Sequence, residues 1–382
     1  MAAINSLDEF DDIRPYTDEE LPERLATLVR DPDLVQMACR IQAPVLYRLM
    51  PLPARWIVGS ALRRRSRSIG SLKDLQSFLA SYVERMIRST TDGFSHSGAE
   101  HLPKNEPCLY VSNHRDIVLD SILVNYALWV NGVPLTQNAV GDNLLQGGLG
   151  NELMRLNRSF TVIRGAETRR AQYHALLKTS RYIRRTLEHG ESIWIAQRQG
   201  RSKDGIDRTD PAILKMFQLA YRSDQMNFDE WLSRVNVVPV SLSYEIDPCA
   251  PMKAHELFVT ETTGSYTKDL REDFRSIAQG IKGFKGRVHV SFSTPVQPLF
   301  STADELAAQI DQQICSCKKI FETYREANRL LEANSEASLL APGRIRHEFE
   351  QQLSNTPEEE RSHLLIQYAN QLEQYRHTNR QQ

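Results

Sequence analysis

The sequence predicts an α/β fold, and three observations support this prediction. Short apolar runs with strand character alternate with segments whose apolar residues recur at helical spacing. One such run, Cys108–Ser112, stops at a polar turn that carries His114, and a helical apolar pattern over residues 117–130 follows at once. The chain has 382 residues, 41% hydrophobic and 25% charged, so it can bury one large core or two modest ones. Because α/β sheets bind ligands at the carboxyl ends of their strands, His114 lies where chemistry is expected.

Composition narrows the possible functions. The formal net charge of −1 argues against a general polyanion binder, so nucleic acid is not an expected partner. Five cysteines cannot all pair and show no metal-type spacing beyond one Cys-x-Cys, which favours a reducing compartment and predicts no metal site. Residues 1–12 lack the basic-then-apolar pattern of a secretory signal, and no uncharged apolar run of about 18 residues predicts a membrane-spanning helix.

The first 92 residues divide into two predicted parts. Residues 1–20 are acidic with few apolar side chains and are predicted to form a flexible arm. Residues 21–92 read as helical. Within them, residues 45–68 mix aromatic and aliphatic side chains with six arginines, which is typical of a helix lying on a membrane surface. A helix docked on the protein with a solvated basic flank is the alternative for the same pattern.

The elements of the remaining chain follow in order. Seven strands are predicted at residues 94–98, 108–112, 137–141, 160–163, 192–196, 235–244 and 287–292. Helices are predicted at residues 117–130, 144–156 and 167–189, the last of them long and basic. Residues 301–382 form a polar helical extension that is interrupted at Ala341-Pro342-Gly343, and we expect an accessory or interaction role for it.

Two polar segments are candidates for chemistry. A carboxylate within hydrogen-bond reach of one His114 ring nitrogen would fix its tautomer and raise its basicity, and Asp116 and Asp120 are both close enough in sequence. The alternative is a capping turn with a structural histidine. The second segment is the loop of residues 197–205. Its two glycines would let backbone amides approach a ligand, and its basic side chains would bind an anion, unless it is simply a solvated basic turn.

Four stretches, in this order, resemble the motifs of the glycerolipid acyltransferase superfamily, which includes the bacterial lysophosphatidate and glycerol-3-phosphate acyltransferases. Asn113-His114 after a strand resembles its Asn-His-x4-Asp motif, and residues 159–164 (SFTVIR) resemble its second block. Gly200-Arg201-Ser202 resembles the third block, Glu-Gly-Thr-Arg-Ser, and Val238-Pro239-Val240 the fourth. The resemblance runs from about residue 94 to 298 and places an acyltransferase domain at residues 93–300.

The sequence departs from the family pattern at two positions. Asp120 is six positions after His114, one more than in the motif, and Leu119 occupies the place of the family's aspartate. A one-residue bulge at the helix start would let Asp120 pair with His114, which we favour, whereas Asp116 would have to reach back across the turn. In the third block Arg198 stands in place of the glutamate and Gln199 in place of the glycine, which bears on the identity of the acceptor.

The resemblance implies a mixed, mainly parallel sheet flanked by helices, with a helical N-terminal region and a helical C-terminal extension. It implies transfer of an acyl group from acyl-CoA or acyl carrier protein to the hydroxyl of a lysophospholipid acceptor, with 1-acyl-glycerol-3-phosphate as the first candidate, in phospholipid biosynthesis. No metal or organic cofactor is implied. The implied catalytic residues are His114 with Asp120 or Asp116. The implied substrate-binding residues are Asn113, Arg115, Arg164, Arg198, Gly200, Arg201 and Ser202, of which Arg164 and Arg201 would hold the acceptor's phosphate.

With a lipid acceptor, the expected location is peripheral, at the cytoplasmic face of the inner membrane. Two alternatives remain at this point. One is an acyltransferase for another lysolipid, such as a lyso-aminolipid, suggested by Arg198. The other is a catalytically inactive lipid-binding or scaffold protein, suggested by the shifted aspartate.

Overall fold

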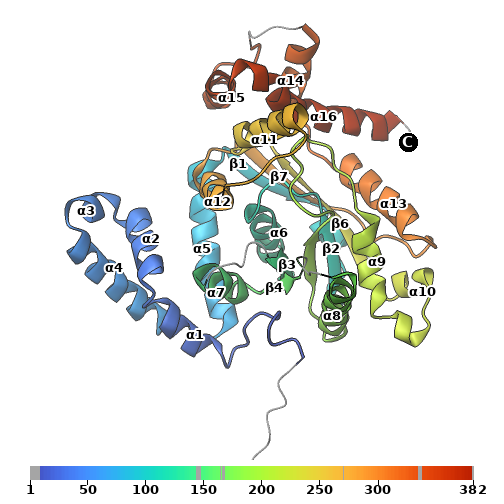
Figure 1. Ribbon diagram of the computed structural model, residues 1–382, viewed down its shortest axis with the longest axis horizontal. Coiled ribbons are helices and arrows are strands. Elements are labelled where there is room, and N and C mark those ends of the chain that lie inside the picture. Colours follow the sequence, from blue (N-terminus) through green and yellow to red (C-terminus); the bar gives the residue numbers. More distant parts are fainter. Residues whose placement is uncertain are drawn as a thin grey trace, which may run out of the picture. The chain divides into compact units, whose positions relative to one another are not determined.

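The computed structural model describes residues 9–142, 148–163, 165, 168–269, 271–333 and 338–380. The chain divides into two compact units. Figure 1 labels the helices and strands along the chain. Unit 1 comprises Met1–Tyr82 and Gln137–Tyr182, and unit 2 comprises Val83–Thr136 and Ile183–Gln382. Helix α5 (Leu72–Thr90) and helix α8 (Arg169–Glu188) each begin in unit 1 and end in unit 2.

The strands form a mixed, mainly parallel sheet, which confirms the predicted fold class. In unit 2 the strand order is β1-β7-β6-β2-β5. These strands are β1 (Gly93–Ser97), β2 (Cys108–Ser112), β5 (Ile193–Ala196), β6 (Asn236–Tyr244) and β7 (Arg287–Phe292). The β6–β7 pair is antiparallel, and the other pairs are parallel. β2 therefore has a parallel neighbour on each side, and its carboxyl end lies beside theirs.

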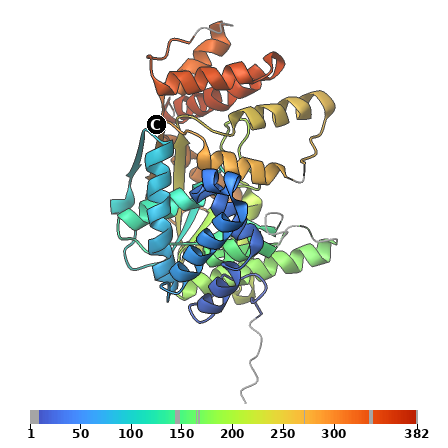
Figure 2. The ribbon, with the colours of Figure 1, turned by 90° about the vertical axis from the view of Figure 1, so that its left-hand side faces the viewer.

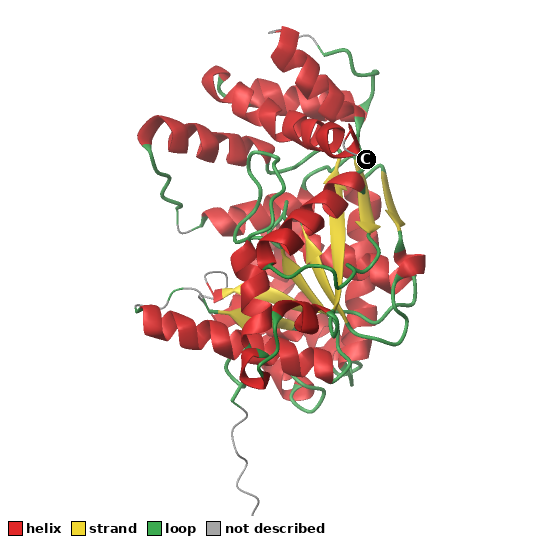
Figure 3. Ribbon diagram, turned by 90° about the vertical axis from the view of Figure 1, so that its right-hand side faces the viewer, coloured by secondary structure: helices red, strands yellow, loops and turns green. Residues whose placement is uncertain are grey.

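Helices flank the unit 2 strands (Figure 3). The helices that lie wholly in unit 2 are α6 (Leu119–Val130), α9 (Pro211–Leu219), α10 (Phe228–Leu232), α11 (Ala250–Thr263), α12 (Glu272–Lys282), α13 (Ala303–Ser316), α14 (Glu322–Ala333), α15 (Arg344–Asn355) and α16 (Arg361–Arg380). Single turns of 3-10 helix lie at Ala99–His101, Arg222–Asp224 and Glu358–Glu360. α6 buries Leu123, Val124 and Leu128 against alternate residues of the strands, such as Val238 and Val240, because alternate strand side chains face the same side of a sheet. α13 packs on the opposite face, against β6 and α9.

The C-terminal helices share a core with the domain that precedes them. Tyr324 of α14, Phe349 of α15 and Tyr368 of α16 are fully or almost fully buried, and they pack with Ala250 and Ala254 of α11. In Figure 2 the helices from α14 onward, coloured orange to red, lie together at one end of unit 2. The C-terminal extension is thus packed on unit 2 over much of its length.

Unit 1 is a group of helices with one parallel strand pair. Its elements are α1 (Leu21–Leu28), α2 (Pro32–Gln42), α3 (Pro44–Leu49), α4 (Pro51–Ser66), β3 (Gln137–Gly141), α7 (Gly148–Leu156) and β4 (Ser159–Val162). Proline begins α2, α3 and α4, where its missing N–H costs no helical hydrogen bond. α2 and α4 pack through Val35, Cys39 and Val58. Among the described helices, none combines the length and apolar character that crossing a bilayer would need.

The predicted elements agree closely with the observed ones. The bounds of β2, β3 and β7 coincide with the predicted residues, and β1, β4, β5 and β6 differ by one residue at one or both ends. Residues 144–147 and residue 167, at the starts of two predicted helices, lie outside the described residues.

Residues 9–20 differ from the expected flexible arm. Phe10, Ile13 and Tyr16 are each at least 97% buried, and the backbone N–H of Thr161 in β4 donates to the carbonyl of Ile13. Arg14 also binds Asp11 and Glu20. Acidic composition indicated disorder, but three apolar side chains spaced three residues apart are enough to fix the segment on unit 1.

Candidate active site

The carboxyl end of β2 is fixed by its neighbours on both sides. On the β5 side, Gln197 N–H donates to the carbonyl of Ser112 at 2.7 Å. On the β6 side, the Asn113 side-chain amide pairs with the backbone of Leu242 as a neighbouring strand would. Its Nδ2 donates to Leu242 O at 3.0 Å and its Oδ1 accepts from Leu242 N at 2.7 Å. The Asn113 side chain is fully buried, so its amide is occupied by the sheet rather than directed at a substrate.

His114 follows and pairs with Asp120. Its Nδ1 lies 2.8 Å from Asp120 Oδ2, and because a carboxylate only accepts hydrogen bonds, Nδ1 carries the proton. Nε2 makes no hydrogen bond within the described residues and is left as the basic nitrogen of the neutral ring. The histidine side chain is 14% exposed and the aspartate is fully buried. The pair is a base with an orienting carboxylate, the arrangement that general base catalysis requires.

The Asp120 carboxylate is itself held by three further donors. Oδ2 also accepts from the backbone N–H groups of Arg115 at 2.6 Å and Asp116 at 2.9 Å. Oδ1 accepts from the Tyr244 hydroxyl at 2.8 Å. Burial and, to a lesser degree, the nearby Asp120 charge raise the pKa of Tyr244 well above its ordinary value. The Tyr244 hydroxyl therefore keeps its proton and remains a donor. Tyr244 was not among the predicted site residues, although its position at the end of the strand beside β2 could have indicated it.

Asp116 has a different role from Asp120. Its Oδ1 accepts from Val118 N at 3.0 Å and Leu119 N at 2.9 Å, which caps the start of α6. Burial, reinforced by the Asp120 charge, raises the pKa of Asp116. Oδ2 faces α12 so closely that a Cβ at Gly280 would lie 2.1 Å from it. The extra residue between His114 and Asp120 is thus taken up in a capped turn before α6, and Asp120 rather than Asp116 contacts the histidine.

Arg115 points into the protein. Its side chain is 5% exposed, and NH2 donates to Asp207 Oδ2 at 2.7 Å and to Gly205 O at 3.3 Å. Lys253 Nζ of α11 donates to the Arg115 carbonyl at 2.7 Å. The predicted substrate contact of Arg115 is therefore replaced by buried internal pairing, and Lys253 and Asp207 are two supporting residues that sequence reasoning missed.

The loop after β5 lies beside His114. Ser202 N–H donates to the His114 carbonyl at 2.8 Å, and the Ser202 hydroxyl bonds to Ile206 O at 3.0 Å within the loop. Gly200 has a φ of +75°, a conformation that favours glycine, and it is exposed. The backbone amides of Gly200 and Arg201 are among several amides of this loop for which no acceptor is found within the described residues.

The two loop arginines are partly occupied. Arg201 is 9% exposed, and its NH1 donates to Ser276 Oγ of α12 at 2.6 Å. Arg198 donates from NH2 to Ile206 O at 3.2 Å and lies 3.7 Å from Asp204. Within the described part of the chain, Arg198 thus makes local contacts at the position of the family's glutamate. Arg164, the remaining predicted phosphate ligand, lies outside the described residues.

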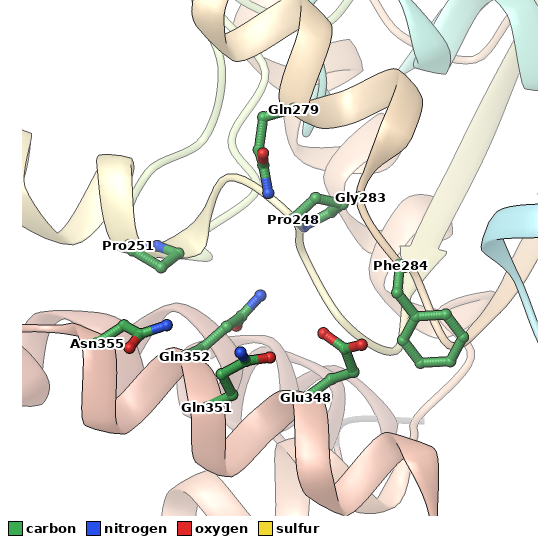
Figure 4. Close-up of a pocket in the computed structure, with 9 residues that line it drawn as sticks. All are labelled: Pro248, Pro251, Gln279, Gly283, Phe284, Glu348, Gln351, Gln352 and Asn355. Atoms are coloured by element: carbon green, nitrogen blue, oxygen red, sulfur yellow. The ribbon is translucent and has the colours of Figure 1, made fainter. Parts of the chain in front are cut away.

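No cluster of three or more histidine, cysteine, aspartate or glutamate side chains suited to a metal ion occurs in the described part of the chain. A cavity of about 280 Å³ lies between α15 and the segment that includes Pro248 and α12. Figure 4 shows polar side chains around it, including Gln279, Gln351 and Glu348. It is lined by none of the predicted site residues, so it is separate from the His114 site.

Comparison with known proteins was made at the level of sequence and of structure. Residues 93–243 match the sequence model of the family described as Acyltransferase. No curated protein matches the chain. Among solved structures, the chain is similar to the 1-acyl-sn-glycerophosphate (LPA) acyltransferase PlsC from Thermotoga maritima, with 18% sequence identity and a TM-score of 0.38, over 66% of this chain and 79% of that one.

The matched span, residues 93–243, contains β1, β2, β5, most of β6 and the whole His114–Asp120 pair. It also contains all four of the motifs from which the resemblance was predicted. Residues 93–243 therefore match an acyltransferase domain, in agreement with the four predicted motifs.

Proposed function

We propose that the protein transfers a fatty acyl group from an acyl thioester, acyl-CoA or acyl carrier protein, to the hydroxyl of a lysophospholipid-type acceptor, with 1-acyl-glycerol-3-phosphate as the first acceptor to test. The observation that carries this proposal is the His114–Asp120 pair, with Nδ1 on the carboxylate at 2.8 Å and Nε2 free to act as the base.

The proposed reaction needs no covalent enzyme intermediate. His114 Nε2 removes the proton of the acceptor hydroxyl as its oxygen attacks the thioester carbonyl. Buried Asp120 stabilises the imidazolium that forms. We expect the backbone N–H groups of Gly200 and Arg201 to stabilise the oxyanion of the tetrahedral intermediate. Collapse of the intermediate breaks the carbon–sulfur bond, and the imidazolium returns the proton to the departing thiolate.

A membrane surface is the proposed location of this reaction, and unit 1 carries the surface suited to it. The side chains of Leu49, Leu52 and Trp56 are 74%, 78% and 72% exposed. Other exposed apolar residues of α2 to α4 and the segments between them are Met37, Ile41, Val45, Met50 and Ile57, and exposed arginines in the same span are Arg40, Arg48, Arg55, Arg64 and Arg65. We call these thirteen residues the α2–α4 patch.

So many large apolar side chains are rarely left exposed on one small region of a soluble surface. Insertion at the headgroup boundary would bury them, while each arginine near anionic lipid adds on the order of 1 kcal/mol. We therefore propose peripheral binding to the cytoplasmic face of the inner membrane, where a lysolipid acceptor would be available.

The proposal is tested by measuring thiol release from acyl-CoA and acyl carrier protein in the presence of vesicles containing lysophosphatidate. His114→Ala should lower acceptor-dependent release by about 10²- to 10⁴-fold, the range for loss of a general base. The variant should still fold, because the Asp120 carboxylate keeps three other hydrogen-bond donors. His101→Ala, at a side chain that is 60% exposed, is the control and should retain full activity. Equal turnover by His114→Ala and wild type would disprove the assignment.

The presence of Arg198 in the third block suggests a second class of acceptor that should be tested. Since Arg198 bonds to Ile206 O at the position of the family's glutamate, no carboxylate of that block is available to bind an acceptor hydroxyl. Lyso-aminolipids should therefore be assayed beside lysophosphatidate. An inactive lipid-binding protein is the less favoured reading, because the shifted Asp120 still contacts His114. Lysolipid binding without any acyl transfer by the wild type would favour it.

A further inference from the structure

The C-terminal helix α16 contacts the turn that follows the third-block loop. We call residues 204–207 the Asp204–Asp207 turn. Asn370 Nδ2 donates to the Asp204 carbonyl at 2.9 Å. Gln374 binds the backbone of Asp207 in both directions: its Oε1 accepts from Asp207 N at 2.8 Å and its Nε2 donates to Asp207 O at 3.0 Å. Two side chains of α16 thus satisfy three backbone groups of a turn about 165 residues earlier in the chain.

The turn and the helix are also in close backbone contact. Gly205 has a φ of +79°, and a Cβ at this position would lie 2.1 Å from the carbonyl oxygen of Gln367 in α16. Only glycine fits both the backbone conformation and this approach. The turn is therefore shaped to pack against α16.

The side chain at the end of this turn reaches the catalytic loop. Asp207 Oδ2 accepts from Arg115 NH2 at 2.7 Å and from Asn113 Nδ2 at 3.3 Å. A second ion pair comes from the C-terminal extension, since Lys318 Nζ lies 2.8 Å from the same oxygen with both side chains fully buried. Although burial alone would raise the pKa of Asp207, the Arg115 and Lys318 cations hold it below its ordinary value, so the carboxylate is charged at neutral pH.

The contacts then continue to the base. Arg115 is the neighbour of His114, and its backbone N–H donates to Asp120 Oδ2, the same oxygen that binds His114 Nδ1. An unbroken series of polar contacts thus runs from Gln374 through Asp207 and Arg115 to the His114–Asp120 pair. Contacts of this kind hold a catalytic group in its productive geometry, and small displacements of such a group can cost up to about 10²-fold in rate.

We propose that the C-terminal extension is part of the active-site scaffold, and that Gln374 and Lys318 are positioning residues that act on His114 through Asp207. The kinetic part of this inference rests on the proposed acyltransferase function. The structural part, that α16 orders the His114 loop, does not.

The test compares two glutamine variants of α16. Gln374→Ala removes both contacts with Asp207. Gln371→Ala is the matched control, because Gln371 is another glutamine of α16, itself buried, and its Nε2 donates to Gln367 O within the helix. Gln374→Ala should lower kcat about tenfold and leave the KM values for thioester and acceptor within twofold, since Gln374 touches the turn and not the substrate site. Gln371→Ala should keep the wild-type kcat.

Hydrogen exchange supplies a readout that does not depend on catalysis. The backbone amides of Arg115 and Asp116 bond to Asp120, and their exchange should be faster in Gln374→Ala than in Gln371→Ala. Exchange and kcat in Gln374→Ala equal to those of the control would overturn the inference. If the wild type transfers no acyl group, the proposed function fails, and the exchange comparison alone still decides the positioning role. If Gln374→Ala does not fold, Asn370→Ala, which loses one contact with the turn, replaces it in the same comparison.

Discussion

Replacing Asp120 with asparagine separates the charge of this side chain from its shape. In the wild type, Oδ2 accepts three hydrogen bonds, from His114 Nδ1 and the N–H groups of Arg115 and Asp116. An asparagine carbonyl in the place of Oδ2 can accept all three, and its NH2 can donate to the Tyr244 hydroxyl oxygen. Asp120→Asn should therefore fold, at a cost of about 1–2 kcal/mol, the scale of one weakened hydrogen bond.

The expected loss of activity follows from the missing charge. A hydrogen bond to a charged group is worth about 1.5–3 kcal/mol, and here that energy stabilises the imidazolium that forms in the transition state. At about 1.4 kcal/mol for each factor of ten, kcat/KM should fall roughly 10- to 150-fold. Asp120→Ala is a poorer test, because it leaves four donors without their acceptor, each costing about 1–3 kcal/mol of stability where it is buried.

The assay is acceptor-dependent thiol release by purified protein on vesicles, with the unfolding midpoint measured on the same samples. Asp116→Asn is the matched control: its carbonyl can still cap α6 through Val118 and Leu119, and Asp116 does not contact His114. It should keep activity within about threefold of the wild type. Wild-type activity in Asp120→Asn, or an equal loss in Asp116→Asn, would refute the assignment of Asp120 as the orienting carboxylate.

Three further predictions concern the acceptor, stability and membrane binding. Arg164→Ala should raise the acceptor KM more than the thioester KM in steady-state kinetics, and the opposite order would remove Arg164 from the phosphate site. Burial raises the pKa of Asp311 to about 6, so the folded protein binds the Asp311 proton more tightly than the unfolded chain does. The free energy of unfolding should therefore fall by up to about 3 kcal/mol as the pH rises from about 4 to 6. Asp311→Asn, which still accepts from Thr209, should have a higher urea midpoint than the wild type at pH 7 and an equal one near pH 4; equal midpoints at both would contradict the reasoning. In vesicle sedimentation, Trp56→Ser should weaken binding to anionic vesicles about tenfold, whereas Leu299→Ser, at a side chain that is 80% exposed outside the α2–α4 patch, should have no effect; equal effects would argue against the patch.

Local sequence patterns were sufficient to predict the strands and the acyltransferase match over residues 93–243. The strand Cys108–Ser112 is fully buried and apolar, and a polar turn and a helix follow it, so its bounds could be predicted to the residue. The four motifs depend on short stretches in a fixed order, which the sequence displays directly, and the family match over residues 93–243 agrees with them. The site residue His114 could be predicted for the same reason, because its place at a strand end is a local property.

Partners distant in sequence could not be predicted in this way. Arg115 and Asn113 follow the same strand as His114 and were expected to bind substrate, yet both turn inward to Asp207 and Leu242, about 90 and 130 residues later in the chain. Composition likewise indicated a loose arm for residues 9–20, where burial of Phe10 and Tyr16 against unit 1 prevails. A single sequence gives side-chain chemistry but not which distant group will neutralise or cover it.

By itself the sequence determined the α/β class, the order of the strands along the chain, the acyltransferase motifs and the position of His114. Tertiary structure alone decided which carboxylate serves it. Asp116 and Asp120 are both near enough in sequence, but capping of α6 occupies Asp116, and Tyr244 and two backbone amides hold Asp120 against the imidazole. Tertiary structure also decided the place of α16, because Gln374 and Asp207 meet only when the chain is folded. Sequence patterns report local preferences, whereas the Tyr244–Asp120 and Gln374–Asp207 contacts join groups more than a hundred residues apart.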